Sequence, residues 1–193
     1  MTLLRQFLAG LRLLLVLTVI LGIGYPLVMT GVGQAAFHAR ANGSLLHHDG
    51  QPVGSALLGQ NFTGPQWFHP RPSAAGTHGY DALASGGSNL GPNSAKLRAA
   101  IAANRTAAAK ADGVPAASVP PDALTASASG LDPDITPAYA YLQANRVARA
   151  RGLDPATVRR LVAAHVTGRA LGFLGEPHVN VLELNLALAN LTG

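Results

Sequence analysis

The chain opens with one long apolar stretch. From Leu13 to Phe37 no residue carries a formal charge, and in its most apolar part, Leu13–Gly33, twelve positions are Leu, Ile or Val. About 20 such residues cross a hydrocarbon core of roughly 30 Å as a helix. The pattern predicts a short N-terminal segment over residues 1–12, a transmembrane helix over 13–33 and one soluble domain over 38–193. A cleaved signal peptide is the alternative, but its apolar core is shorter, and Gly33–Gln34–Ala35 is a poor cleavage site.

Small residues and a proline interrupt this apolar stretch. Pro26 lacks an amide donor and crowds the carbonyl of Gly22, so the sequence predicts a kink there. Small residues allow another helix to approach closely, which predicts contact with a second membrane subunit. That glycine is simply common in membrane helices is the alternative. The residues concerned are Gly22, Gly24, Gly31 and Gly33.

The charges before the stretch predict its orientation. Arg5 and Arg12 are basic and no acidic residue accompanies them. The positive-inside rule therefore places the N-terminus in the cytoplasm and the domain after about His38 outside it.

Turn and cap residues divide the rest of the chain into elements. Asp49–Gly50 lies between two short apolar runs, Ser44–Leu46 and Val53–Leu58, and predicts a β-hairpin. Val179–Leu184 has the composition of a strand. Three helices are expected from their N-terminal caps, beginning at Asn93 or Ser94, at Thr136–Pro137 and at Asp154–Pro155, and the last two end at Gly152 and Gly168.

The segments between these elements lack a sustained period. Residues 63–93 have the composition of ordered loops, and residues 114–129, rich in Ala, Pro and Ser, predict an exposed connection. The whole indicates a small α+β domain behind one transmembrane helix.

Composition and charge exclude several classes of protein. Cysteine is absent from the 193 residues, which rules out disulfides and Cys-ligated metal centres. Only 12% of residues are charged, and the formal net charge is +5. Arg146, Arg149 and Arg151 recur at helical spacing and predict a solvated helix face. No aromatic platform accompanies them, so no nucleic-acid partner is expected.

Three constellations could carry chemistry. The glycine-rich run Ser85–Gly91 could cradle phosphate, but it lacks the Lys-Ser/Thr of a P-loop, and a turn with left-handed glycines is favoured. Seven histidines form no HExxH motif or tight cluster, so no metal site is expected, and His165 is read as a partly buried structural residue. Ser127 and Ser129 would need a histidine base to act as nucleophiles. The residues alone indicate an anchored accessory or binding module, with an anchored extracytoplasmic hydrolase as the alternative.

Many segments resemble one family in order and in detail. They are Gly54–Gln60, Arg71–Ala74, Ser85–Asn93, Thr125–Pro133, Arg146–Leu153, Gly168–Pro177, Val179–Leu182 and Leu184–Leu188. Together they resemble the C subunit of the Kdp-type, ATP-driven, high-affinity potassium transporter over almost the whole chain. Three positions depart from the pattern: Ala128 stands for a usual Gly, Asp134 for a usual His and His178 for a usual Arg.

The resemblance implies partners and a role. The partners are a channel-like potassium-translocating subunit, a P-type ATPase subunit and a very small membrane subunit, in the lipid of a bacterial inner membrane. The resemblance implies a subunit that is itself non-catalytic. The family's C subunit is described as a catalytic chaperone, which means that it raises the ATPase subunit's affinity for ATP. Potassium is the transported ion, ATP serves the complex, and no tightly bound cofactor is implied.

The resemblance also implies candidate sites, and the expected topology argues against direct contact between one of them and ATP. The SGGS segment has been likened to the signature of ABC transporters, but about 30 Å of hydrocarbon would separate the domain from cytoplasmic ATP. Scaffolding that acts on ATP affinity through linkage is the easier interpretation. Candidate nucleotide-binding residues are Ser85, Gly86, Gly87, Ser88, Asn89 and Gln60. Candidate partner-binding residues are Gly22, Gly24, Pro26, Gly31, Gly33, Arg71, Asp132, Glu176 and Asn180.

Overall fold

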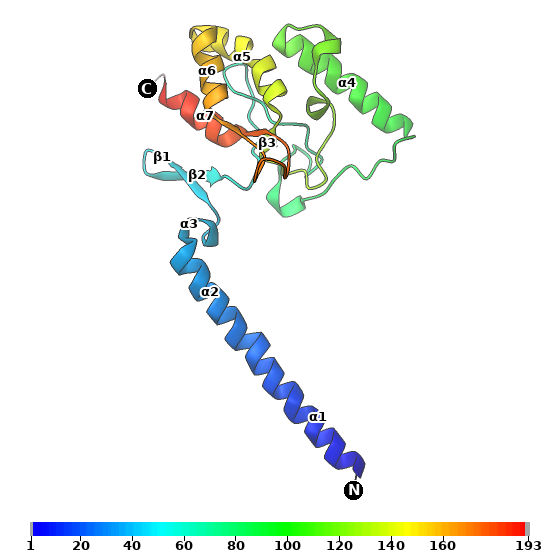
Figure 1. The fold of residues 1–193 in the computed structure, drawn as a ribbon. Helices are drawn as coiled ribbons and strands as arrows, with labels where there is room; N and C mark the ends of the chain where they lie inside the picture. Colours follow the sequence, from blue (N-terminus) through cyan, green and yellow to red (C-terminus); the bar gives the residue numbers. More distant parts are fainter. Residues whose placement is uncertain (1, 192–193) are drawn as a thin grey trace. The chain divides into compact units, whose positions relative to one another are not determined.

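The computed structural model describes residues 2–191, which form two compact units that meet in sequence at Leu45 and Leu46 (Figure 1). In the first unit, helix α1 (Thr2–Val19), the π-helical turn η1 (Ile20–Gly24) and α2 (Tyr25–Ala36) run on as one helix, followed by α3 (His38–Ala41). The continuous helix from Thr2 to Ala36 is long and apolar enough to cross a membrane, and none of its side chains is buried.

The π-helical turn stands directly before Pro26. Tyr25 donates its amide to the carbonyl of Ile20, five residues back. Pro26 has no amide to offer the carbonyl of Gly22, and a widened turn is one way in which a helix accommodates that missing bond. The disturbance expected at Pro26 therefore takes the form of a π-bulge one turn earlier.

The predicted hairpin is confirmed. Strand β1 (Leu45–His48) and strand β2 (Gln51–Ser55) flank Asp49 and Gly50, whose φ angles of 50° and 76° are those of a two-residue type I′ turn. The strands reach closer to the turn than the apolar runs suggested, and β2 ends at Ser55 rather than Leu58.

The three predicted helices are α4 (Ala95–Asp112), α5 (Pro137–Arg151) and α6 (Pro155–Ala164). Side-chain caps start α4 and α5, whereas Asp154, which precedes α6, makes no capping hydrogen bond with its side chain. Ser94 Oγ accepts from the Leu97 amide at 3.3 Å, and Thr136 Oγ1 accepts from the Tyr139 amide at 3.2 Å. Gly152, with φ 66°, ends α5 as expected.

Two expectations near the C-terminus are wrong. Helix α6 ends at Ala164 instead of Gly168, because Val166–Thr167 leaves the helix to form strand β4. The strand expected over Val179–Leu184 is only β5 (His178–Asn180), and helix α7 (Val181–Asn190) follows at once. The Asn180 side chain accepts from the Glu183 amide at 3.1 Å and caps that helix, a signal that the apolar run concealed.

A small antiparallel sheet and the helices α5 and α7 enclose the core. Strand β5 pairs with β3 (Asp134–Ile135) on one side and with β4 on the other, and its Val179 is fully buried. Helix α5 packs against α4, α6 and β5. The largest fully buried side chains are Phe68, Leu184, Leu188, Gln143, Val147, Val158, Val162, Val179 and Asn185.

The segment over residues 114–129 is not an exposed connection. It forms the short 3₁₀ turns η3 (Ala116–Ser118) and η4 (Pro121–Ala123), a third such turn, η2 (Ala82–Ala84), lying earlier in the chain. Val119, Ala123 and Leu124 are 7%, 3% and 7% exposed and join the core. The apolar core positions of this Pro-rich segment follow no helical or strand period, so the sequence pattern did not reveal them.

Arg146 is also not on a solvated face. Its guanidinium is buried and bonded on every side: Nε to Asp112 Oδ1 at 2.7 Å, and one amino group to the carbonyls of Pro65 and Trp67 at 2.7 and 2.9 Å. The other amino group reaches Gln143 Oε1 at 2.6 Å. Its acidic partner lies 34 residues away, beyond the reach of a spacing argument.

Candidate functional site

Residues 125–134, here called the central loop, connect segments that lie far apart in the sequence. Three successive carbonyls of this loop accept hydrogen bonds from three different segments. Gly86 N donates to Ser129 O at 2.9 Å, Ser73 Oγ to Gly130 O at 2.6 Å and Gly59 N to Leu131 O at 2.9 Å. Four of the segments that carry the family resemblance therefore meet at one place in the fold, namely Gly54–Gln60, Arg71–Ala74, Ser85–Asn93 and Thr125–Pro133.

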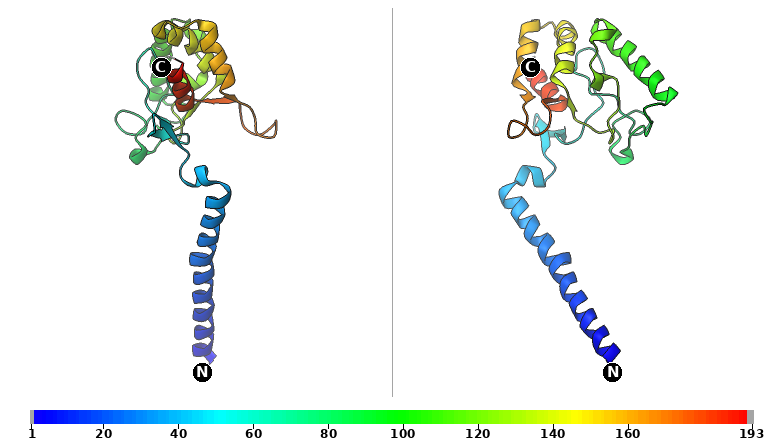
Figure 2. Two further views of the ribbon diagram at one scale, coloured as in Figure 1. Left: turned by 90° about the vertical axis from the view of Figure 1, so that its left-hand side faces the viewer. Right: turned by 45° about the vertical axis from the view of Figure 1, so that its right-hand side comes forward.

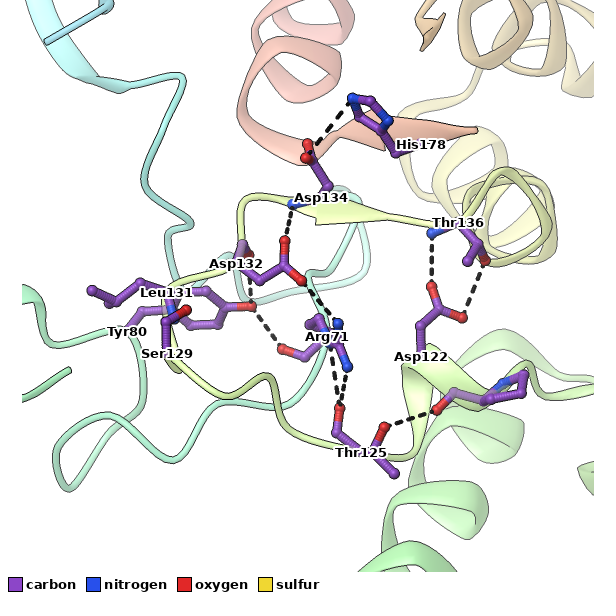
Figure 3. Close-up of polar contacts among 11 residues, drawn as sticks. Arg71, Tyr80, Asp122, Thr125, Ser129, Leu131, Asp132, Asp134, Thr136 and His178 are labelled. Atoms are coloured by element: carbon purple, nitrogen blue, oxygen red, sulfur yellow. Dashed lines mark hydrogen bonds and ion pairs between the residues drawn. The ribbon is translucent and has the colours of Figure 1, made fainter. Parts of the chain in front are cut away.

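Arg71 closes the central loop across its two ends (Figure 3). One amino group of its guanidinium pairs with Asp132 Oδ2 at 2.8 Å, while Nε and the other amino group donate to the carbonyl of Thr125 at 3.4 and 3.3 Å. The planar fork of an arginine suits such simultaneous contacts in a way that a lysine would not. Arg71 thus fixes the shape of the loop.

Tyr80 supports Arg71 from the other side. Its hydroxyl donates to the Arg71 carbonyl at 2.8 Å (Figure 3), and its amide donates to Ser73 Oγ at 2.8 Å. Burial, and after it the negative charge of Asp132, raises the pKa of Tyr80, so the phenol stays a neutral donor. An isolated tyrosine in a loop gave no sequence signal for this role.

Hollows on the surface meet at Arg71. One of about 600 Å³ is lined by Leu57, Leu58, Ser129 and Asp132, and Arg71 contributes to its wall. A smaller one of about 300 Å³ is also lined by Arg71, together with Asp122, Asp132, Asp134, Glu176 and His178.

The carboxylates of the smaller hollow already have protein partners. Asp122 accepts from the amide and the hydroxyl of Thr136 at 2.7 and 3.1 Å, and Asp132 holds Arg71. Across residues 2–191, no group of three or more His, Asp or Glu side chains is arranged to hold a metal ion. The acidic lining is therefore engaged in structure.

Two of the three departures from the family pattern lie together. His178 Nε2 is 3.9 Å from Asp134 Oδ2, across the pairing of β5 with β3 (Figure 3). Burial raises the pKa of Asp134, and the nearby His178 opposes that shift. Where the resemblance expects a histidine and an arginine, this chain has an aspartate and a histidine, which attract each other whenever the histidine is protonated.

Comparison with known proteins decides the family. The family described as "KdpC: K+-transporting ATPase, c chain" matches residues 7–190. A "Potassium-transporting ATPase KdpC subunit" from Kineococcus radiotolerans is 60% identical over 186 residues, 96% of this chain and 94% of that protein. Proteins of the same name from Mycobacterium tuberculosis H37Rv and Gemmatimonas aurantiaca are 57% and 56% identical, over 97% and 91% of this chain and 99% and 88% of theirs. The chain belongs to the KdpC family.

Three of the six nucleotide-binding candidates of this KdpC chain donate hydrogen bonds within the domain. Ser85 Oγ bonds to Ser129 O at 3.0 Å, as the Gly86 amide does, and Gln60 Nε2 bonds to the Val53 carbonyl at 2.8 Å. Ser88 and Asn89 are exposed. The expectation of left-handed glycines is wrong for Gly86 and Gly87, because the left-handed residue of the run is Asn89, with φ 51°.

Several partner-binding candidates of the KdpC chain have structural contacts too. Asn180 donates to the Ala56 carbonyl at 2.8 Å and caps α7. Glu176 pairs with Arg169 at 2.8 Å. Arg71 and Asp132 shape the central loop, and the five candidates in the first unit lie along its exposed helix.

Gly87 offers a test of the structural role of the glycine-rich run. A Cβ there would lie 2.9 Å from the backbone carbonyl oxygen of Ala128, which has little room to move. Gly87→Ala should therefore cost about 1–3 kcal/mol of unfolding free energy. Gly91→Ala is the matched control, because a Cβ at Gly91 meets nothing within 4 Å.

The same two variants test nucleotide binding. We expect calorimetry on the purified full chain in detergent to detect no ATP binding, in the parent or in either variant. ATP binding that Gly87→Ala abolishes without lowering the stability would contradict the structural role.

Proposed function

We propose that this chain is a non-catalytic subunit that assembles the K+-transporting ATPase and biases the conformation of its membrane subunits. The observation that carries the proposal is the central loop, where the chemically suggestive segments bond to one another. Their donors serve the fold, and the domain so built can act as a rigid binding module. Its partners in this proposal are the channel-like subunit, the P-type ATPase subunit and the small membrane subunit.

The proposed topology has the N-terminus in the cytoplasm and residues 38–193 outside. It rests on Arg5 and Arg12, which precede the apolar helix. ATP is then out of reach of the domain, and a rise in the ATPase subunit's affinity for ATP must come through linkage. If the chain binds one conformation of the ATPase subunit better, it favours the nucleotide affinity of that conformation.

An anchored hydrolase has less support. Ser127 Oγ is buried without a hydrogen-bond partner in the described part of the chain, and Ser129 Oγ accepts from the Leu131 amide. Among residues 2–191, neither serine hydroxyl makes a hydrogen bond to a histidine, the contact by which a base would take its proton in nucleophilic catalysis.

The apolar helix is proposed to bind a partner helix as well as to anchor the domain. At about 100° per residue, Gly24 and Gly31 are seven residues apart and lie on one side of the helix. Gly22 stands inside the π-helical turn, where this period does not hold. A Cβ at Gly31 would meet nothing within 4 Å in this chain, which leaves room for a neighbour. In lipid, helix association depends on such close packing.

Replacing Leu13–Gly33 by a plain Leu/Ala span of equal length tests this contact. The variant keeps the anchor and its orientation but lacks the glycines and the π-bulge before Pro26. We expect normal insertion, checked by resistance to alkaline extraction, and lower recovery of the channel-like and ATPase subunits in a mild-detergent pull-down. Potassium-stimulated ATP hydrolysis should fall in proportion. Full assembly with the plain span would contradict this contact and show that the helix only anchors the domain.

A further inference from the structure

The loop between β4 and β5 presents a cluster of large apolar side chains to solvent. Leu171, Phe173 and Leu174 are 83%, 71% and 51% exposed. This apolar tip, defined as residues 170–175, stands out from the body of the second unit as the orange-brown loop (Figure 2, left). Three such side chains at one turn form an exposed patch of the kind that marks an interaction site.

The apolar tip is a built structure. Ala170 and Leu174 exchange both of their amide–carbonyl bonds at 2.9 Å, and the amides of Gly172 and Phe173 donate to carbonyls at the start of the turn at 3.1 and 3.3 Å. An ion pair of 2.8 Å between Arg169 and Glu176 closes its base. These amides are therefore satisfied within the loop, and the tip can enter an apolar environment without stranding them.

The backbone of Leu171 has a conformation that is unfavourable for a residue with a side chain. Its φ is 54°, in the left-handed region that glycine adopts without steric strain and leucine does not. Glycine would adopt this φ with less strain than leucine. The exposed leucine side chain, rather than the shape of the turn, is therefore what residue 171 supplies. Strained positions of this kind cluster at binding sites.

We propose that the apolar tip docks into an apolar recess on a membrane subunit of the same ATPase complex. The inference deepens the proposed function, because it names the surface by which the domain would hold a partner. Phe173 and the two leucines would act as the anchors that a few buried residues provide at protein interfaces.

The charges around the tip favour a protein partner over a lipid surface. Segments that bind a bilayer surface combine apolar side chains with free basic residues. Arg169 is already paired, and its partner Glu176, whose side chain is 78% exposed, would repel anionic headgroups. The tip also lacks the tryptophan or tyrosine typical of membrane interfaces.

Site-specific cross-linking in the assembled complex tests the occupant. A photoreactive phenylalanine analogue in place of Phe173 should cross-link to one membrane subunit, identified by mass spectrometry. The matched control carries the analogue at Leu83, which is 98% exposed in the 3₁₀ turn η2, and should give no such product. Cross-links only to lipid, or none at all, would overturn the proposal.

Two substitutions separate docking from folding. Leu171→Gly, which suits the positive φ, and Phe173→Ser should leave the melting temperature of the purified chain unchanged. Combined, they should lower recovery of the partner subunits on the order of tenfold, while Leu83→Ser should not. Unchanged recovery would contradict docking by the tip. The assembly role itself would survive that result if the plain-span variant of the helix still lost its partners.

Discussion

Replacing Arg146 by methionine is expected to lower the unfolding free energy of the second unit by about 3–5 kcal/mol, because it leaves the Asp112 carboxylate buried without its partner. Both side chains are at most 5% exposed, and the guanidinium also satisfies the carbonyls of Pro65 and Trp67. Arg146 joins α4, α5 and the loop before Phe68, so its loss removes more than one pair. Urea unfolding of the full chain in detergent, followed by the fluorescence of Trp67, its one tryptophan, measures the loss.

Two further variants make this experiment specific. Arg149→Met, on the exposed side of the same helix, should change the unfolding free energy by less than about 0.5 kcal/mol. Arg146→Met combined with Asp112→Leu should be less harmful than Arg146→Met alone, since it leaves no unpaired charge. Equal losses of unfolding free energy for Arg146→Met and Arg149→Met would contradict the buried role of Arg146 and support the solvated position that its spacing predicted.

The parts of the fold that were predicted correctly depend on local signals. A cap such as Ser94 or Thr136, the Asp49–Gly50 turn and the glycine after α5 act within a few residues of the structure they determine. Helix α7 was missed because its cap, Asn180, sits between apolar residues that also suit a strand. The strand β5 and the helix follow each other without a break, and composition alone cannot divide them.

The central loop shows why the site was harder to predict than the elements. Family resemblance identified the segments around Arg71, Ser85 and Asp132, but no local pattern indicates that carbonyls at 129, 130 and 131 receive donors from 86, 73 and 59. Such contacts join positions 43 to 72 residues apart. The buried pairing of Arg146 with Asp112 was missed for the same reason.

Membrane topology decides between scaffolding and direct contact with ATP. The chain has no cysteine, so single-cysteine variants report one position each. Thr2 precedes the apolar helix, and Leu83, 98% exposed, lies in the second unit. Both positions should react with a maleimide once the membrane is permeabilised, which serves as the control.

Labelling intact cells with a membrane-impermeant maleimide is the most direct test of the account. The cysteine in Leu83→Cys should react fully and the one in Thr2→Cys should stay protected, because the domain lies outside and the N-terminus in the cytoplasm. The opposite pattern, with Thr2→Cys labelled and Leu83→Cys protected, would place the domain beside cytoplasmic ATP and contradict a purely scaffolding role.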